Sequence, residues 1–162
     1  MHKNIDLLIR ACKSSSTGLD IIGEGELEKD LRSLTKELQA DINFLGQVPN
    51  QELPQIMNSY LGFVLCSHKE GCPKVLLEAM SCGLPCIGTR VPGIQNFIDH
   101  GLNGLLCEEN ETDLAKCIQR IVRDEELRLH IGKGAREYIL KNCSIDSIVD
   151  KEYALYKEMC SC

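Results

Sequence analysis

Short apolar runs alternate with amphipathic segments along most of this chain, and this alternation limits the folds that it can adopt. The apolar runs have the length and composition of buried strands, and they are 19–22, 42–45, 61–66, 85–88 and 104–107. Segments with helical periodicity lie between and after them, at 26–38, 53–57, 74–81, 94–98, 112–123, 125–141 and 144–159. Strands that alternate with helices form right-handed βαβ units. The sequence therefore predicts an α/β protein with a Rossmann-like parallel sheet and helices on both faces.

The chain length indicates one domain. Its 162 residues are 43% hydrophobic and 26% charged, which are values typical of a globular protein. No repeat or low-complexity linker divides the sequence, so we expect a single domain over residues 1–162. In an open parallel sheet, ligands bind at the carboxyl ends of the strands. The loops after Ile22, Leu45 and Cys66 are therefore the first places to look for a site.

Composition excludes several classes of function. A net charge of −6 argues against nucleic-acid binding, which requires a basic surface. No run approaches the roughly 20 apolar residues of a membrane span, so we predict no membrane contact. The first residues lack the layout of a secretion signal, and we expect a cytoplasmic protein. In that compartment the 10 cysteines are expected to be reduced and to act as small hydrophobic residues. The compact zinc spacing Cys-x-x-Cys is missing, so no metal site is predicted.

The strongest chemical pattern runs from Glu70 to Met80. Glu70 lies in the loop after an apolar strand, and Glu78 follows eight positions later inside the next helix. Between them, the amides of Lys74, Val75 and Leu76 belong to the first helical turn, where N–H groups lack helical partners and the helix dipole favours anions. Such an end can bind a diphosphate, and a carboxylate further along the helix can bind ribose hydroxyls.

The alternative interpretation is that both carboxylates are solvated surface charges. The neighbours of Glu78 argue against it, because Leu77 precedes and Ala79 follows it in an almost wholly apolar helix. A carboxylate buried there without a partner would be costly. We therefore expect Glu78 to be inside a ligand site and Glu70 to be at its rim.

This block resembles the signature of the retaining family 4 glycosyltransferases of the GT-B fold. The signature is Glu, seven residues, Glu, then Ala-Met-x-x-Gly-x-Pro, and here it runs from Glu70 to Pro85. Similarity to the family extends to the segments 3–9, 19–25, 44–48 and 101–106. The chain looks like the second, donor-binding domain of such an enzyme, without the first, acceptor-binding domain.

The resemblance implies a role for each matching residue. Glu70 would be the catalytic position next to the transferred sugar, Glu78 would bind the ribose, and Lys3 would neutralise the leaving diphosphate. The other implied donor-binding positions lie near the strand ends, in the loop before the helix and in its first turn, and they are Gly23, Gly25, Gln47, Val48, Gly71, Cys72, Lys74 and Val75.

The implied substrate is a nucleotide-diphosphate sugar, with a uridine diphosphate donor favoured. Lys3 and the helix amides would stabilise the leaving group electrostatically, so neither a metal nor a cofactor is expected. The acceptor is not readable, although the pattern leans toward polysaccharide or lipid-linked glycan synthesis. Transfer would require an N-terminal acceptor domain, supplied in cis or in trans.

Some residues depart from the family pattern and keep alternatives open. No arginine stands a few residues before Lys3, and Asn96 replaces a family glutamate that follows Gly93. His68 is either a general base or a polar loop residue. The chain could therefore be a non-catalytic nucleotide-sugar-binding or scaffold module, or another activated-sugar enzyme. Glu28 interrupts the dinucleotide fingerprint that starts at Gly23, which argues against a dehydrogenase.

Overall fold

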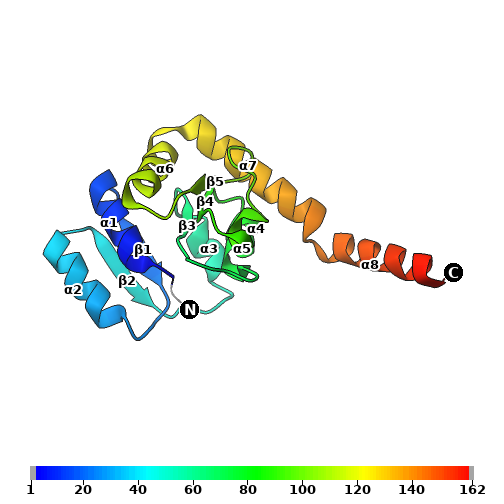
Figure 1. The fold of residues 1–162 in the computed structure, drawn as a ribbon, viewed down its shortest axis with the longest axis horizontal. Helices are drawn as coiled ribbons and strands as arrows, with labels where there is room; N and C mark the ends of the chain where they lie inside the picture. The colour runs from blue at the N-terminus through cyan, green and yellow to red at the C-terminus, as the bar shows by residue number, and fades with distance from the viewer. Residues whose placement is uncertain (1–2, 161–162) are drawn as a thin grey trace.

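The predicted order of strands and helices is present in the protein. The computed structural model describes residues 3–160 (Figure 1). The strands are β1 (Leu19–Ile22), β2 (Ile42–Gly46), β3 (Phe63–Leu65), β4 (Cys86–Thr89) and β5 (Leu105–Cys107). The helices are α1 (Ile5–Ser15), α2 (Glu28–Leu38), α3 (Leu53–Met57), α4 (Lys74–Ser81), α5 (Pro92–Gln95), α6 (Glu111–Arg123), α7 (Glu125–Asn142) and α8 (Ile145–Cys160). The α/β class is confirmed.

All strand pairs in the described chain are parallel, as predicted, but they form two sheets. β1 pairs with β2 through Leu19 opposite Ile42, and β3, β4 and β5 form a second sheet in that order. No ladder joins β1 to β3 within residues 3–160. Helix α1 packs against α6 (Figure 1), and its side chain Leu8 lies in one buried cluster with Ile87 of β4, against which Leu19 of β1 also packs. The expectation of one continuous sheet is corrected in this respect.

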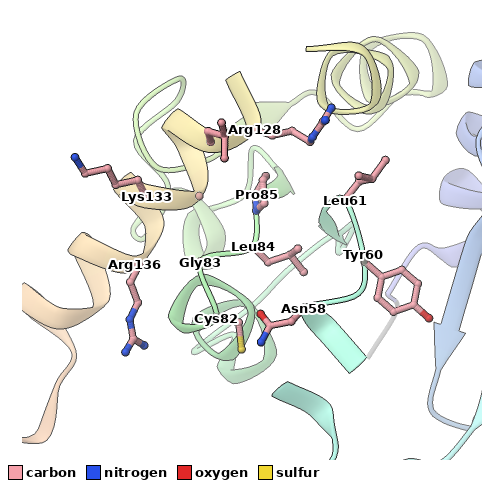
Figure 2. Close-up of a pocket in the computed structure, with 12 residues that line it drawn as sticks. Asn58, Tyr60, Leu61, Cys82, Gly83, Leu84, Pro85, Arg128, Lys133 and Arg136 are labelled. Carbon is pink, nitrogen blue, oxygen red and sulfur yellow. The ribbon is translucent and has the colours of Figure 1, made fainter. Parts of the chain in front are cut away.

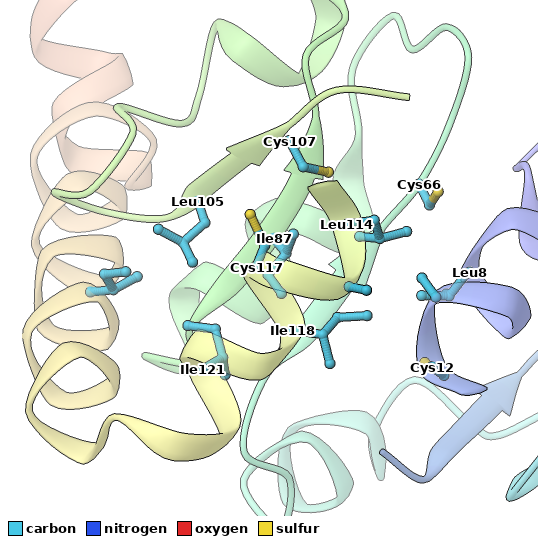
Figure 3. Close-up of a cluster of buried hydrophobic side chains, with 13 residues drawn as sticks. Leu8, Cys12, Cys66, Ile87, Leu105, Cys107, Leu114, Cys117, Ile118 and Ile121 are labelled. Atoms are coloured by element: carbon cyan, nitrogen blue, oxygen red, sulfur yellow. The ribbon is translucent and has the colours of Figure 1, made fainter. Parts of the chain in front are cut away.

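Helices cover both faces of the three-stranded sheet. Neighbouring residues of β4 point to opposite sides, because Ile87 packs in one buried cluster and Cys86 in the other. Figure 3 shows the first cluster, in which Leu8 of α1 and Ile118 of α6 meet. Every residue of β4 and β5 is buried. Burial on both faces explains why these strands read as continuous apolar runs.

The buried cysteines behave as small hydrophobic residues. Burial raises the pKa of Cys12 and Cys66 to about 12, so both thiols are protonated at neutral pH. The cysteines between residues 3 and 160 are all free, and Cys82 is only half-buried. The predicted packing role holds for Cys66, Cys86, Cys107 and Cys117.

Several helix ends differ from their predicted positions by one or two residues. Pro73 lies just before α4, and Gly83 adopts a positive φ of 71° directly after the Cys82 cap. Asn110 caps α6, since its side chain accepts a hydrogen bond from the Asp113 N–H at 2.9 Å. The α3 cap is Glu52, without a side-chain hydrogen bond.

The last helix, α8, is expected to exchange its amide hydrogens rapidly. It extends away from the other helices and buries none of its residues (Figure 1). An isolated helix of this length is only marginally stable in water. Hydrogen exchange followed by mass spectrometry should show fast labelling of α8 and slow labelling of α6, whose apolar face is buried. Protection of α8 equal to that of α6 would contradict this prediction.

Candidate active site at the start of helix α4

The candidate site lies where β3 ends and the chain turns into α4. The loop between them contains Glu70, and the end of the neighbouring strand β4 supplies Thr89. Both strands are parallel, so their carboxyl ends meet at the same edge of the sheet. This is the edge at which open α/β sheets bind ligands.

Glu70 is buried and strongly hydrogen-bonded, which differs from the exposed rim position expected for it. Only 7% of the residue is exposed. Its Oε1 atom accepts hydrogen bonds from Lys3 Nζ at 2.6 Å and from Ser67 Oγ at 2.7 Å. Burial by itself would raise the pKa of this carboxyl, but the bonds from Lys3 and Ser67 and the Lys3 charge outweigh it and lower the pKa below its usual value. Glu70 is therefore ionised at neutral pH.

Lys3 lies just before α1 and contacts Glu70, although the two residues are 67 positions apart in the sequence. Its side chain remains 41% exposed. A half-exposed lysine can exchange one anionic partner for another, because its ammonium group has three rotatable donors on a flexible stem. Lys3 can therefore contact both the carboxylate and an incoming anion.

The first turn of α4 offers fewer free amides than the sequence suggested. The Lys74 N–H donates to the Cys72 carbonyl at 3.0 Å, and the Leu76 N–H donates to the Pro73 carbonyl at 2.9 Å. Within the described chain, the amides of Gly71, Cys72 and Val75 have no backbone acceptor. The available donors thus lie in the loop as well as in the helix.

Glu78 lies on the exposed face of α4, so the prediction that it is buried was wrong. The buried face of α4 consists of Leu76, Ala79 and Met80. One residue turns a helix by about 100°, so Glu78 points away from this face although apolar residues flank it in sequence. Within residues 3–160 its side chain has no hydrogen bond or ion pair. It remains free to contact a ligand.

The carboxyl ends of β1 and β2 form a second group of predicted residues. Gly23 has φ 116°, a conformation that favours glycine, and its N–H donates to the Gly46 carbonyl at 2.7 Å. Gln47 is exposed, and its Nε2 donates to Glu24 Oε2 at 3.2 Å. Gly25 is also exposed.

The structure joins some of the predicted residues directly and leaves others apart. Lys3 and Glu70 are in contact, whereas no hydrogen bond in the described chain links them to Gln47 or to the half-buried Val48. His68 does not approach Glu70 through a hydrogen bond; its Nδ1 pairs with Glu109 Oε2 at 2.5 Å.

A separate pocket of about 450 Å³ lies at the opposite edge of the sheet (Figure 2). Its lining includes Leu61 and Pro85, which directly precede β3 and β4, and Arg128 and Arg136 from α7. These two arginines donate to backbone carbonyls, Arg128 to Ile121 and Arg136 to Ser81. They stabilise helix ends there, so the pocket is not part of the predicted site.

Sequence reasoning assigned no role to three residues that support Glu70: Ser67 and Gly93 contact it, and Thr89 bonds Ser67. Ser67 and Thr89 are fully buried, and the Thr89 hydroxyl donates to the Ser67 carbonyl at 2.6 Å. A Cβ atom on Gly93 would lie 2.0 Å from the Glu70 carbonyl oxygen, so only glycine fits there. A polar residue at the end of an otherwise apolar strand was the available signal for Ser67 and Thr89.

Comparison with known proteins identifies the class. A family profile described as glycosyl transferases group 1 matches residues 1–138. The chain belongs to this family, and its structural neighbours are glycosyltransferases of the GT-B type. No helix in residues 3–160 is long and apolar enough to cross a membrane. Over the same residues, no group of three or more acidic, histidine or cysteine side chains is placed to hold a metal ion.

Three proteins illustrate the similarity. N-acetyl-alpha-D-glucosaminyl L-malate synthase of Bacillus anthracis is 34% identical over 97% of this chain and 42% of its own length. A UDP-Gal:alpha-D-GlcNAc-diphosphoundecaprenol alpha-1,3-galactosyltransferase of Escherichia coli is 33% identical over 86% of this chain and 36% of its own length. TarM of S. aureus, in a complex with Fondaparinux, alpha-GlcNAc-glycerol and UDP, has a TM-score of 0.86 and 26% identity, and the match covers 95% of this chain and 33% of TarM. The chain thus spans about two fifths of the length of the curated relatives it matches.

Proposed function

We propose that this chain is the donor-binding half of a retaining, family 4 type glycosyltransferase. The observation that carries the proposal is the arrangement around α4: an ionised Glu70, open amides at Gly71, Cys72 and Val75, and a free Glu78 further along the helix. A carboxylate and N–H groups so arranged suit a ligand that combines hydroxyl groups with a diphosphate. A nucleotide-diphosphate sugar is such a ligand.

Each residue then has a chemical role. Glu78 binds the ribose hydroxyls, and the amides of Gly71, Cys72 and Val75 bind the diphosphate, with the Lys74 side chain adding positive charge. Breaking the sugar–phosphate bond leaves positive charge on the sugar and negative charge on the diphosphate. Glu70 lies next to the sugar, and Lys3 moves from Glu70 to the leaving group as its charge develops.

Other residues of this chain contact the nucleotide base of the donor. The backbone at Gln47 and Val48 contacts the nucleotide base, and Gly23 and Gly25 let the backbone approach the donor. A uridine diphosphate donor is supported by the UDP bound to TarM and by the UDP-Gal in the name of the Escherichia coli relative. We further propose that the acceptor is a polysaccharide or lipid-linked glycan, used in the cytoplasm.

A second, N-terminal domain completes the enzyme in this proposal, in cis or in trans. The matched relatives are more than twice as long as the part that this chain covers. The chain alone is therefore expected to bind the donor without transferring its sugar. Such partial binding should be weak, with a Kd of about 0.1–1 mM.

Calorimetry tests the proposal directly. The chain is titrated with uridine and guanosine diphosphates and with their glucose and N-acetylglucosamine derivatives. Saturable binding of one nucleotide series supports the donor site and names the base. The absence of binding up to 10 times the expected Kd of about 1 mM would overturn the donor-binding proposal and favour a scaffold role.

Donor binding is expected to be independent of divalent metal. Lys3 and the open amides meet the diphosphate charge, so EDTA should leave the calorimetric Kd unchanged. The control is the same titration after Mg²⁺ or Mn²⁺ is added in excess. A loss of binding in EDTA that either ion restores would contradict the prediction.

A further inference from the structure

Two buried hydroxyl groups support Glu70 in two steps, which we call the relay: Thr89 fixes the Ser67 backbone, and the Ser67 hydroxyl contacts the Glu70 carboxylate. The Thr89 hydroxyl, at the end of β4, donates to the Ser67 carbonyl at 2.6 Å. The Ser67 hydroxyl, in the loop after β3, donates to Glu70 Oε1 at 2.7 Å. Both Ser67 and Thr89 have no exposed surface, so water does not compete for either bond. The relay connects the rigid centre of the sheet to one specific carboxylate oxygen.

The two oxygens of Glu70 are not equivalent. Oε1 accepts from both Ser67 and Lys3, whereas Oε2 has no donor within the described chain. No fully buried side-chain oxygen or nitrogen in that part of the protein lacks a partner. Oε2 must therefore retain contact with solvent, although the Glu70 side chain is only 3% exposed. It is the oxygen that remains available to a ligand.

We propose that Ser67 and Thr89 are positioning residues that hold the Glu70 carboxylate so that Oε2 faces a hydroxyl of the transferred sugar. This inference rests on the proposed donor-binding function. Glu70 gains a fixed orientation, because a bond to Oε1 from the buried side leaves only Oε2 for the ligand. Lys3 is not expected to fix the orientation alone, because its side chain is 41% exposed and, in the proposed function, changes partner when the diphosphate binds.

The backbone around Glu70 is held as firmly as its side chain. Gly93, at the start of α5, lies so close that a Cβ atom would stand 2.0 Å from the Glu70 carbonyl oxygen and 2.8 Å from the Glu70 Cβ. Glu70 is therefore held on two sides. Gly93 of α5 lies against its backbone, and Ser67, whose own backbone is fixed by Thr89 of β4, donates to its carboxylate. A functional group must be supported in this way if it is to keep its geometry when a ligand arrives.

The first test removes the hydroxyl that contacts Glu70. In Ser67→Ala, carbon-13 NMR of the Glu70 carboxyl is expected to show a higher pKa than in the wild type, because one of the two donors to the carboxylate is lost. Calorimetry should show about tenfold weaker binding of the nucleotide sugar, while the nucleoside diphosphate, which does not reach Glu70, binds as before. A structural role alone would not separate these two ligands.

A matched pair at Thr89 tests the second step of the relay. Thr89→Val keeps the shape and removes the hydroxyl, whereas Thr89→Ser keeps the hydroxyl. The inference predicts that the valine variant shifts the Glu70 pKa and the sugar-specific affinity in the same direction as Ser67→Ala, and that the serine variant matches the wild type. Thermal denaturation identifies any variant that fails to fold. If a variant at Ser67 or Thr89 fails to fold, the variant at the other of these two positions tests the positioning role.

The outcomes separate this inference from the proposed function. If the wild-type chain binds no nucleotide, the donor-binding function fails, and with it the orientation toward a sugar. If the wild type binds a nucleotide sugar, but Ser67→Ala and Thr89→Val leave both the Glu70 pKa and the sugar-specific affinity unchanged, only the positioning role is overturned.

Discussion

Replacing Glu78 with alanine is expected to weaken binding of the donor nucleotide by about 100-fold or more, which removes it from the range that calorimetry detects. The variant loses hydrogen bonds from two ribose hydroxyls to a carboxylate, and each such bond contributes about 1.5 kcal/mol or more. Because Glu78 is exposed and has no partner in the described chain, its loss should change the free energy of unfolding by less than about 0.5 kcal/mol. The effect is therefore on binding and not on folding.

The matched control is Glu37→Ala. Glu37 is also an exposed helical carboxylate, in the last turn of α2, and its replacement removes the same charge from a face outside the site. The control should bind the donor as the wild type does. Equal binding by the Glu78→Ala and Glu37→Ala variants would exclude Glu78 from the donor site and leave the signature in this chain without its central function.

Replacing Gly93 with alanine should lower the free energy of unfolding by about 1–3 kcal/mol and also impair the site. The added methyl group would lie 2.0 Å from the Glu70 carbonyl oxygen and 2.4 Å from its carbonyl carbon. Both of these Glu70 atoms belong to the backbone, which cannot rotate away as a side chain can. Chemical denaturation in urea measures the loss of stability. Donor binding should weaken as well, because Glu70 must shift.

Gly25→Ala is the control for this substitution. No atom lies within 4 Å of the position that a Cβ atom would take at Gly25, and its φ is not positive. The variant should be as stable as the wild type in urea. A Gly93→Ala protein with wild-type stability and unchanged donor affinity would show that α5 does not press on Glu70.

Periodicity was sufficient to place the secondary structure from residue 19 onward, although it did not predict α1. The runs that became β3, β4 and β5 are short, apolar and bounded by turn residues, and α4 spans the predicted residues 74–81. Helix and strand periods depend on neighbouring residues within one or two turns, so a single sequence contains them. The same local pattern located the loop between β3 and α4 as the candidate site.

The burial of the two glutamates could not be read in the same way. Flanking apolar residues suggested that Glu78 is inside, but the helical turn places it opposite to Leu76, Ala79 and Met80. A helical projection of the sequence would have shown this. The burial of Glu70 had no local signal, because Gly93 of α5 lies against its backbone and Lys3, before α1, binds its carboxylate.

The amino-acid sequence alone was thus enough to predict the α/β class, the strands and helices from residue 19 onward and the block from Glu70 to Glu78. The division of the strands into two sheets, the Lys3–Glu70 pair and the relay through Ser67 and Thr89 all required the folded chain. Except for the Ser67–Glu70 bond, these features join residues that are separated by 22 to 67 positions in the sequence. Contacts over such separations depend on how whole elements pack, and no local period records that packing.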